Sequence, residues 1–237
     1  MTKRTVQQIK DRFNSDVERF SDLDKGQEAA VDSTVALGLV ASAALAVNPK
    51  AQSLLDLGCG AGNWTVKLLQ QRPGLDVTLV DLAPAMLKRA QERALAAGAA
   101  SVTVLESDLR EVNLDRAFDI VVASAVLHHL RDDPDWHRVF SKIFQLVAPG
   151  GSFWMFDLVD HEIPEVAQLM LASHGRHLES IGGKEYRDGI FGIIEREDTP
   201  RPVTYQLDLL REVGFTRVDL LHKNSRFAVF GAVKGRG

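Results

Sequence analysis

The residues with the clearest chemical potential in this 237-residue chain are three alternating glycines, Gly58, Gly60 and Gly62, with the carboxylate of Asp56 just before them. Glycine has no Cβ, so it allows a tight turn in which the backbone comes close to a ligand. The apolar run at residues 53–57 predicts a buried parallel strand, and residues 64–71 predict a short helix. A strand, a glycine turn and a helix N-terminus together form a nucleotide pocket at the carboxyl end of a sheet.

The spacing of the glycines separates two classes of ligand. Dinucleotide-binding turns have the pattern G-x-G-x-x-G, whereas this chain has G-x-G-x-G with a carboxylate two residues ahead of it. Asp56 would repel a pyrophosphate and attract an ammonium or sulfonium group. An NAD-dependent oxidoreductase is the alternative, but its turn would need the longer G-x-G-x-x-G spacing of the glycines.

The segment Asp-Leu-Gly-Cys-Gly-Ala-Gly resembles the first motif of the class I S-adenosylmethionine (SAM) dependent methyltransferases. Four more signals follow in the order of that family, at residues 76–81, 102–109, 118–130 and 146–153. The resemblance implies an α/β, Rossmann-like fold: a seven-stranded mixed sheet with helices on both faces, an antiparallel last strand, an N-terminal helical lid and an insert after strand five. It also implies SAM as the cofactor and S-adenosylhomocysteine as the product.

By the same resemblance, residues at the strand ends would hold the cofactor. Asp56 would bind the methionine ammonium, Asp81 with Leu82 the ribose, Asp108 with Leu109 the adenine, and Ser124 would line the methionine end. Gly58, Gly60 and Gly62 would let the backbone come close to the ligand. The position of Asp81 also agrees with spacing, because nucleotide folds place a ribose-binding acid roughly twenty residues past the glycines. For Asp108 a helix or turn cap is the structural alternative, since Asp is a favoured cap.

His128 and His129 are the candidate catalytic bases, because imidazole titrates near neutral pH. A base is needed only when the nucleophile arrives protonated. Adjacent residues of a helix point about 100° apart, so we expect only one of the two to face a ligand and no chelating pair. His161, His174 and His177 lack the ligand spacing of known zinc sites, and we expect no metal.

The substrate is expected between two covers. Residues 2–20 have apolar side chains at helical spacing, and Phe13 and Phe20 would form a lid. A helix that only packs on the domain is the alternative. The insert at residues 158–200 would be the second cover, and four side chains are candidates for the substrate pocket by position: Trp154, Asp157, Tyr186 and Tyr205.

The chain divides into a lid region (residues 1–50), a cofactor core (51–157), the insert (158–200) and a C-terminal helix with a strand hairpin (201–237). A long helix is expected at residues 27–47, after a break at 22–26. In the insert we expect one helix at 164–178, followed by glycine-rich loops.

Composition limits the partners and the compartment. A formal charge of −4 and a pI near 6.0 argue against a general polyanion binder. Cys59 is the only cysteine, which excludes an internal disulfide and favours a reducing cytoplasm. The apolar run at 35–47 is too short to span a bilayer, and we expect no membrane contact.

The acceptor is expected to be an oxygen or nitrogen atom of a small molecule. The chain also loosely resembles the enzymes that modify wobble uridine of tRNA with carboxy-SAM. Leu209 stands where those enzymes carry an arginine, and an apolar side chain cannot compensate the extra carboxylate, so we expect ordinary SAM. A tRNA acceptor, a homodimer and a non-enzymatic SAM-binding module are the remaining alternatives.

Overall fold

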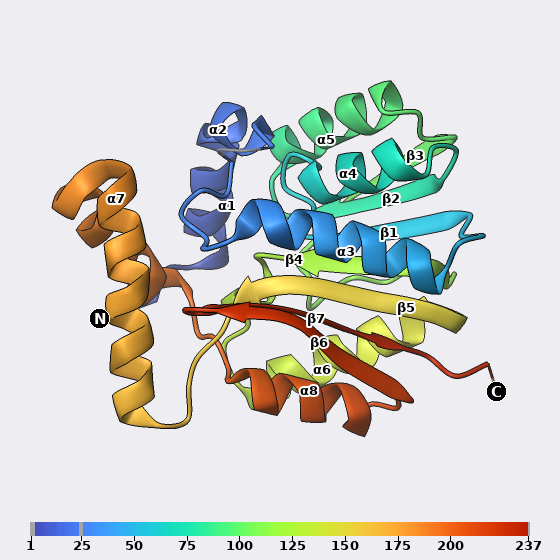
Figure 1. The fold of residues 1–237 in the computed structure, drawn as a ribbon. Coiled ribbons are helices and arrows are strands. Elements are labelled where there is room, and N and C mark those ends of the chain that lie inside the picture. The colour runs from blue at the N-terminus through green and yellow to red at the C-terminus, as the bar shows by residue number, and fades with distance from the viewer. Residues whose placement is uncertain (1–2, 24–25, 237) are drawn as a thin grey trace.

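A seven-stranded sheet forms the centre of the protein, in the order β3-β2-β1-β4-β5-β7-β6 (Figure 1). The computed structural model describes residues 3–23 and 26–236. The strands are β1 (Ser53–Leu57), β2 (Asp76–Asp81), β3 (Ser101–Glu106), β4 (Phe118–Ser124), β5 (Val147–Leu158), β6 (Arg217–Asn224) and β7 (Phe227–Val233). Strands β1 to β5 are parallel, and β7 is antiparallel to both of its neighbours. The predicted fold class is confirmed, including the reversed last strand.

Two layers of helices cover the sheet. Helices α3 (Ser33–Val47), α4 (Asn63–Gln71) and α5 (Pro84–Ala96) share one apolar core with one face of the sheet. On the other face lie α6 (Asp133–Leu146) and α8 (Val203–Glu212). The central strands are buried on both faces, as in β1 and β7, and their side chains are therefore mostly apolar.

A third group of helices lies beyond the carboxyl ends of the parallel strands (Figure 1). Helices α1 (Val6–Ser15) and α2 (Val17–Ser21) pack against α5 and the glycine turn through a small apolar cluster. Helix α7 (Pro164–Glu197) is the insert after β5. These elements are the two covers that the sequence predicts.

The insert contains more helix than the sequence predicts. We expected a helix at 164–178 and then loops, but α7 continues to Glu197 with a kink at Gly182 and Gly183. Both residues leave helical angles, and Gly183 has a φ of +74°, which suits glycine, whereas the other glycines of α7 keep helical angles. The pair therefore divides α7 into two helical segments joined at a kink.

The helix before β1 begins later than expected. It starts at Ser33 and not at residue 27, because turns occupy residues 26–32 and Asp32 takes a left-handed φ of 60°. The predicted break at 22–26 includes Asp24 and Lys25, which lie outside the described residues. Among the helices that the structure describes, none is long and apolar enough to cross a membrane.

Candidate functional site

A cavity of about 260 Å³ opens at the carboxyl ends of the parallel strands. Its floor and walls come from the segments that follow β1, β2, β3 and β4, and its roof from α1, α2 and α7. Open α/β sheets bind their ligands at this edge. The cavity is therefore the candidate functional site.

The three glycines of the turn serve different purposes. All have positive φ, at +68°, +50° and +83°. A Cβ on Gly58 would collide with Val126, and one on Gly62 would press on α5. Gly60 lines the cavity, and a Cβ there would meet no atom within 4 Å, so the missing side chain leaves room for a ligand.

Asp56 lies beneath this turn and outside the cavity lining. Its carboxylate is fully buried and accepts a 2.6 Å hydrogen bond from the Thr65 hydroxyl, while its Oδ1 has no hydrogen-bond partner. Burial raises the pKa of Asp56 to about 7, against the hydrogen bond from Thr65. The structure thus gives Asp56 no direct contact with the space where the methionine ammonium is expected.

Asp81 reaches the cavity from the end of β2, together with Leu82. The main-chain N–H groups of Gly60 and Ala83 each donate a 2.8 Å hydrogen bond to its carboxylate. Burial raises the pKa of Asp81 in spite of these bonds. The carboxylate is held rigidly against the glycine turn, and each oxygen has a lone pair left for a ligand.

Asp108, Leu109 and Ser124 also line the cavity. Burial raises the pKa of Asp108, but the hydrogen bonds and charge of Arg110 outweigh it and lower the pKa overall. The N–H of Arg110 also donates to Asp108 at 2.9 Å, so the turn-capping alternative for this residue is present as well. The buried hydroxyl of Ser124 has no hydrogen-bond partner.

The roof over the cavity is aromatic and aliphatic. Phe13 and Phe20 line it from α1 and from α2, with ring centroids 5.4 Å apart. Ile190, Ile193 and Ile194 line it from the second half of α7. These side chains form the apolar part of the cavity lining.

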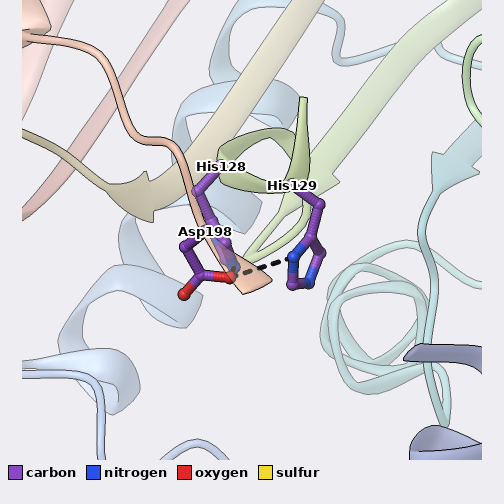
Figure 2. A group of neighbouring side chains, drawn as sticks. All are labelled: His128, His129 and Asp198. Carbon is purple, nitrogen blue, oxygen red and sulfur yellow. Dashed lines mark ion pairs between the residues drawn. The ribbon is translucent and has the colours of Figure 1, made fainter. Parts of the chain in front are cut away.

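Both histidines of the pair line the cavity, contrary to the expectation that only one would do so. They belong to a 3₁₀ turn, η1 (Leu127–His129), and not to an α-helix. Their ring centroids lie 4.4 Å apart. The side chains converge on Asp198, the residue after α7 (Figure 2).

The buried carboxylate of Asp157 fixes His128 from behind. Asp157 pairs with His128 Nδ1, and it accepts hydrogen bonds from the main-chain N–H groups of Leu127 and His128 at 2.8 and 3.2 Å. Burial alone would lower the pKa of His128, but Asp157 and Asp198 raise it to about 9. Burial would likewise raise the pKa of Asp198, and the two histidines lower it.

None of the four pocket residues that were predicted by position lines the cavity, and Asp157 lies behind His128. Trp154 is buried in the core and donates to Ser152, Tyr205 packs edge-on against Trp136, and Tyr186 is on α7 beside the kink. Leu209 is buried between α8 and the sheet. The comparison of Leu209 with an arginine therefore has no bearing on the ligand.

The other histidines of the insert do not form a cluster. His174 Nε2 donates to the Ala29 carbonyl at 2.9 Å, and His177 Nε2 donates to the Glu28 carbonyl at 2.7 Å. His161 Nε2 contacts the Lys223 ammonium. Because a carbonyl oxygen only accepts, the first two rings carry their proton on Nε2. In the described part of the chain, one group of side chains has metal-ligand geometry: His128, His129 and Asp198.

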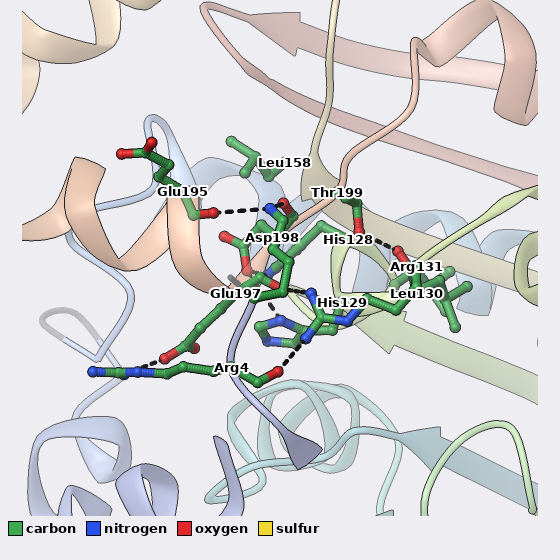
Figure 3. Close-up of polar contacts among 12 residues, drawn as sticks. Arg4, His128, His129, Leu130, Arg131, Leu158, Glu195, Glu197, Asp198 and Thr199 are labelled. Carbon is green, nitrogen blue, oxygen red and sulfur yellow. Dashed lines mark hydrogen bonds and ion pairs between the residues drawn. The ribbon is translucent and has the colours of Figure 1, made fainter. Parts of the chain in front are cut away.

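Sequence reasoning missed the end of α7. Glu197 is fully buried and pairs with Arg4 and Arg12 of the N-terminal segment. Arg131 donates to the main-chain carbonyls of Glu197 and Arg4 (Figure 3). Adjacent acids just before Thr-Pro at the close of the insert were the available signal.

The comparisons with known proteins agree with this geometry. Residues 54–151 match the family described as a methyltransferase domain. The carboxy-S-adenosyl-L-methionine synthase of Cronobacter sakazakii is 29% identical over 193 residues, which cover 80% of this chain and 77% of that protein.

Two solved structures have a similar fold. The magnesium protoporphyrin IX methyltransferase of Synechocystis, solved with S-adenosylhomocysteine, has a TM-score of 0.67 at 17% identity and covers 98% of this chain and all (100%) of that one. Human N-acetylserotonin methyltransferase, in complex with SAM, has a TM-score of 0.60 at 19% identity, with 91% and 57% covered. This chain thus spans little more than half of the human enzyme, and both matches show a similar fold.

Proposed function

The chain belongs to the class I SAM-dependent methyltransferases, and from that premise we propose that it transfers a methyl group from SAM to an oxygen or nitrogen atom of a small molecule. The observation that carries the proposal is the cavity at the carboxyl ends of the strands. It brings the glycine turn, Asp81, Asp108 and the His128–His129 pair together under one apolar roof.

The residues present fit the cofactor. Space is left at Gly60, where a side chain would enter the cavity. Asp81 offers two fixed oxygens to a ribose diol, and the unpartnered Ser124 hydroxyl is available to the methionine portion. Leu109 and Asp108 lie where the adenine would be held.

When bound, SAM supplies an activated methyl group on a sulfonium ion, so the protein has mainly to align the nucleophile and exclude water. The carboxylates of Asp81 and Asp198 favour a cation in the cavity. The aromatic roof of Phe13 and Phe20 would shield the reacting atoms from solvent. The histidine end is the polar part of the wall that remains for the acceptor.

The size of the acceptor follows from the enclosure. A roof of α1, α2 and α7 encloses the cavity, so an acceptor has to fit beneath it beside the cofactor. A folded RNA would need an open, basic approach, and the chain has a net charge of −4. These observations favour a small acceptor over tRNA.

Transfer of a labelled methyl group tests the proposal. The protein is incubated with methyl-labelled SAM and a cell extract that has been separated into a low-mass fraction and an RNA fraction. We expect label in the low-mass fraction only, and none with Asp81→Ala. Label in the RNA would contradict the small acceptor, and label in neither fraction would contradict methyl transfer.

A second candidate is chemistry with carboxy-SAM, because a relative matched over 80% of this chain is named a carboxy-SAM synthase. The extra carboxylate would need a free cation. Among the described residues, four arginines line the cavity. Arg12, Arg19 and Arg110 each pair with a carboxylate, and Arg131 donates to two main-chain carbonyls. We therefore expect the protein to bind SAM in preference to carboxy-SAM when both are present in equal amounts. The bound ligand is identified by mass. Recovery of mainly carboxy-SAM would favour the second candidate.

A further inference from the structure

The side chains of His128, His129 and Asp198 bring two imidazole nitrogens and one carboxylate oxygen together at the inner wall of the cavity (Figure 2). We propose that these three residues bind one divalent transition-metal ion. The proposal that the ion binds is argued from the geometry of this cluster alone. Only a role of the ion in catalysis rests on the proposed methyl transfer.

The distances suit a shared ion. Asp198 Oδ1 lies 3.0 Å from His129 Nδ1 and 3.7 Å from His128 Nε2, and all three atoms lie within 4.8 Å of one another. Ligand atoms about 2.1 Å from one ion are about 3.0 Å apart in octahedral and about 3.4 Å apart in tetrahedral geometry. The three atoms already have nearly the separations that a common ion requires.

The donor atoms approach each other without forming a hydrogen bond. His129 Nδ1 and Asp198 Oδ1 are buried, and neither has a hydrogen-bond partner despite their 3.0 Å separation. Buried polar atoms are normally satisfied, and an ion between them would satisfy both.

A second carboxylate orients the first ligand. Asp157 holds His128 at Nδ1, so Nε2 is the ring nitrogen that faces Asp198 and that would give up its proton to bind an ion. A carboxylate behind a metal-binding histidine is the usual arrangement, since it fixes the tautomer and raises the basicity of the ligand. Asp157 itself is fully buried and tied to three main-chain N–H groups, so it is a rigid support.

The site is also anchored between two distant segments. The N–H of Thr199 donates to the His128 carbonyl at 2.7 Å, and its hydroxyl donates to the Leu130 carbonyl (Figure 3). These bonds fix Asp198 against the η1 turn. The neighbouring arginines Arg4 and Arg12 are paired with Glu197, which leaves the charge of Asp198 available to a cation.

The ligand set selects the class of metal. Two imidazoles and one carboxylate suit Mn²⁺, Fe²⁺, Co²⁺ or Zn²⁺, whereas Mg²⁺ and Ca²⁺ prefer oxygen ligands. Three protein ligands leave coordination positions open, and the cavity is beside all three residues. An acceptor hydroxyl could bind there and lose its proton to water more readily. Its oxygen would then form a bond to the methyl carbon while the carbon–sulfur bond of SAM breaks.

Cobalt binding to the tag-free, chelator-treated protein tests the site without SAM. We expect one Co²⁺ per chain, with the visible absorption of a bound ion, and competition by Zn²⁺. Asp198→Asn and His129→Gln should each weaken binding by roughly tenfold to hundredfold or more. The matched control is His137→Gln, which removes an exposed histidine of α6 that pairs with Glu212 away from the cavity.

The outcomes separate the two proposals. Retained SAM binding in Asp198→Asn, together with lost cobalt binding, would show that the variant is folded and that the metal site is specific. Equal cobalt binding by the wild type and both variants would overturn the proposal, as would no stoichiometric binding of Co²⁺, Mn²⁺ or Zn²⁺. Cobalt binding without methyl transfer in any extract would leave the site standing and contradict the proposed function.

Discussion

The buried carboxyl group of Asp56 makes the stability of this protein depend on pH in an unusual direction. Burial raises the pKa of Asp56 from 3.8 to about 7. Between these two pH values the folded protein keeps a proton that the unfolded chain has released. The free energy of unfolding therefore falls as the pH rises through this window, and it levels off above about pH 7.

The size of the effect follows from the shift. Each pKa unit corresponds to about 1.4 kcal/mol, so the full shift amounts to about 4 kcal/mol. About 2.5 kcal/mol of this would be lost between about pH 5 and about pH 8. In Asp56→Asn the residue carries no charge in either state, so we expect that part of the slope to disappear. The variant should be more stable than the wild type at the alkaline end.

Urea denaturation at several pH values measures the slope, followed by circular dichroism and by the fluorescence of the three buried tryptophans. Asp76→Asn is the control, because it removes an exposed carboxylate from the start of β2 and should stay parallel to the wild type. If Asp56→Asn keeps the same pH slope as the wild type, Asp56 is not the group responsible and the reasoning is wrong.

Two further predictions concern the cofactor and the roof. Asp81→Ala should weaken binding of SAM and S-adenosylhomocysteine by roughly tenfold to hundredfold, because it removes fixed charged acceptors worth about 1.5–3 kcal/mol. If calorimetry shows an unchanged affinity, Asp81 does not bind the cofactor. Residues of α1, α2 and the second half of α7 should gain protection from hydrogen exchange when S-adenosylhomocysteine binds, since their side chains close the cavity. Equal protection in both states would mean that these segments are fixed structure.

Sequence reasoning was most successful where chemistry depends on local order. The acids and glycines at the strand ends follow buried strands, and parallel strands bring their carboxyl ends to one edge. Asp81, Asp108 and Ser124 consequently line the same cavity. Asp56 is the exception, because its side chain points beneath the turn to Thr65.

The remaining features depend on contacts between distant segments. Asp198 meets His128 only because α7 continues through its glycines and returns to the η1 turn. No periodic pattern in the sequence predicts that the end of α7 contacts the η1 turn. The divergence expected of His128 and His129 assumed an α-helix, and a 3₁₀ turn held by Asp157 brings them together. Trp154 and Tyr205 were chosen by position, but their rings belong to the core.

The N-terminal segment does more than cover the cavity, because it holds the residues of the site in place. Glu197 is fully buried only because Arg4 and Arg12 pair with it. The N–H of Arg4 donates to the Arg196 carbonyl at 2.8 Å, and Arg131 joins the carbonyls of Arg4 and Glu197. Asp198 follows directly in the chain and contacts both histidines. If α1 moved away, Glu197 would lose its partners, and the bonds of Thr199 to the η1 turn would be left to hold Asp198. We therefore expect the closed roof to steady the histidine–aspartate cluster.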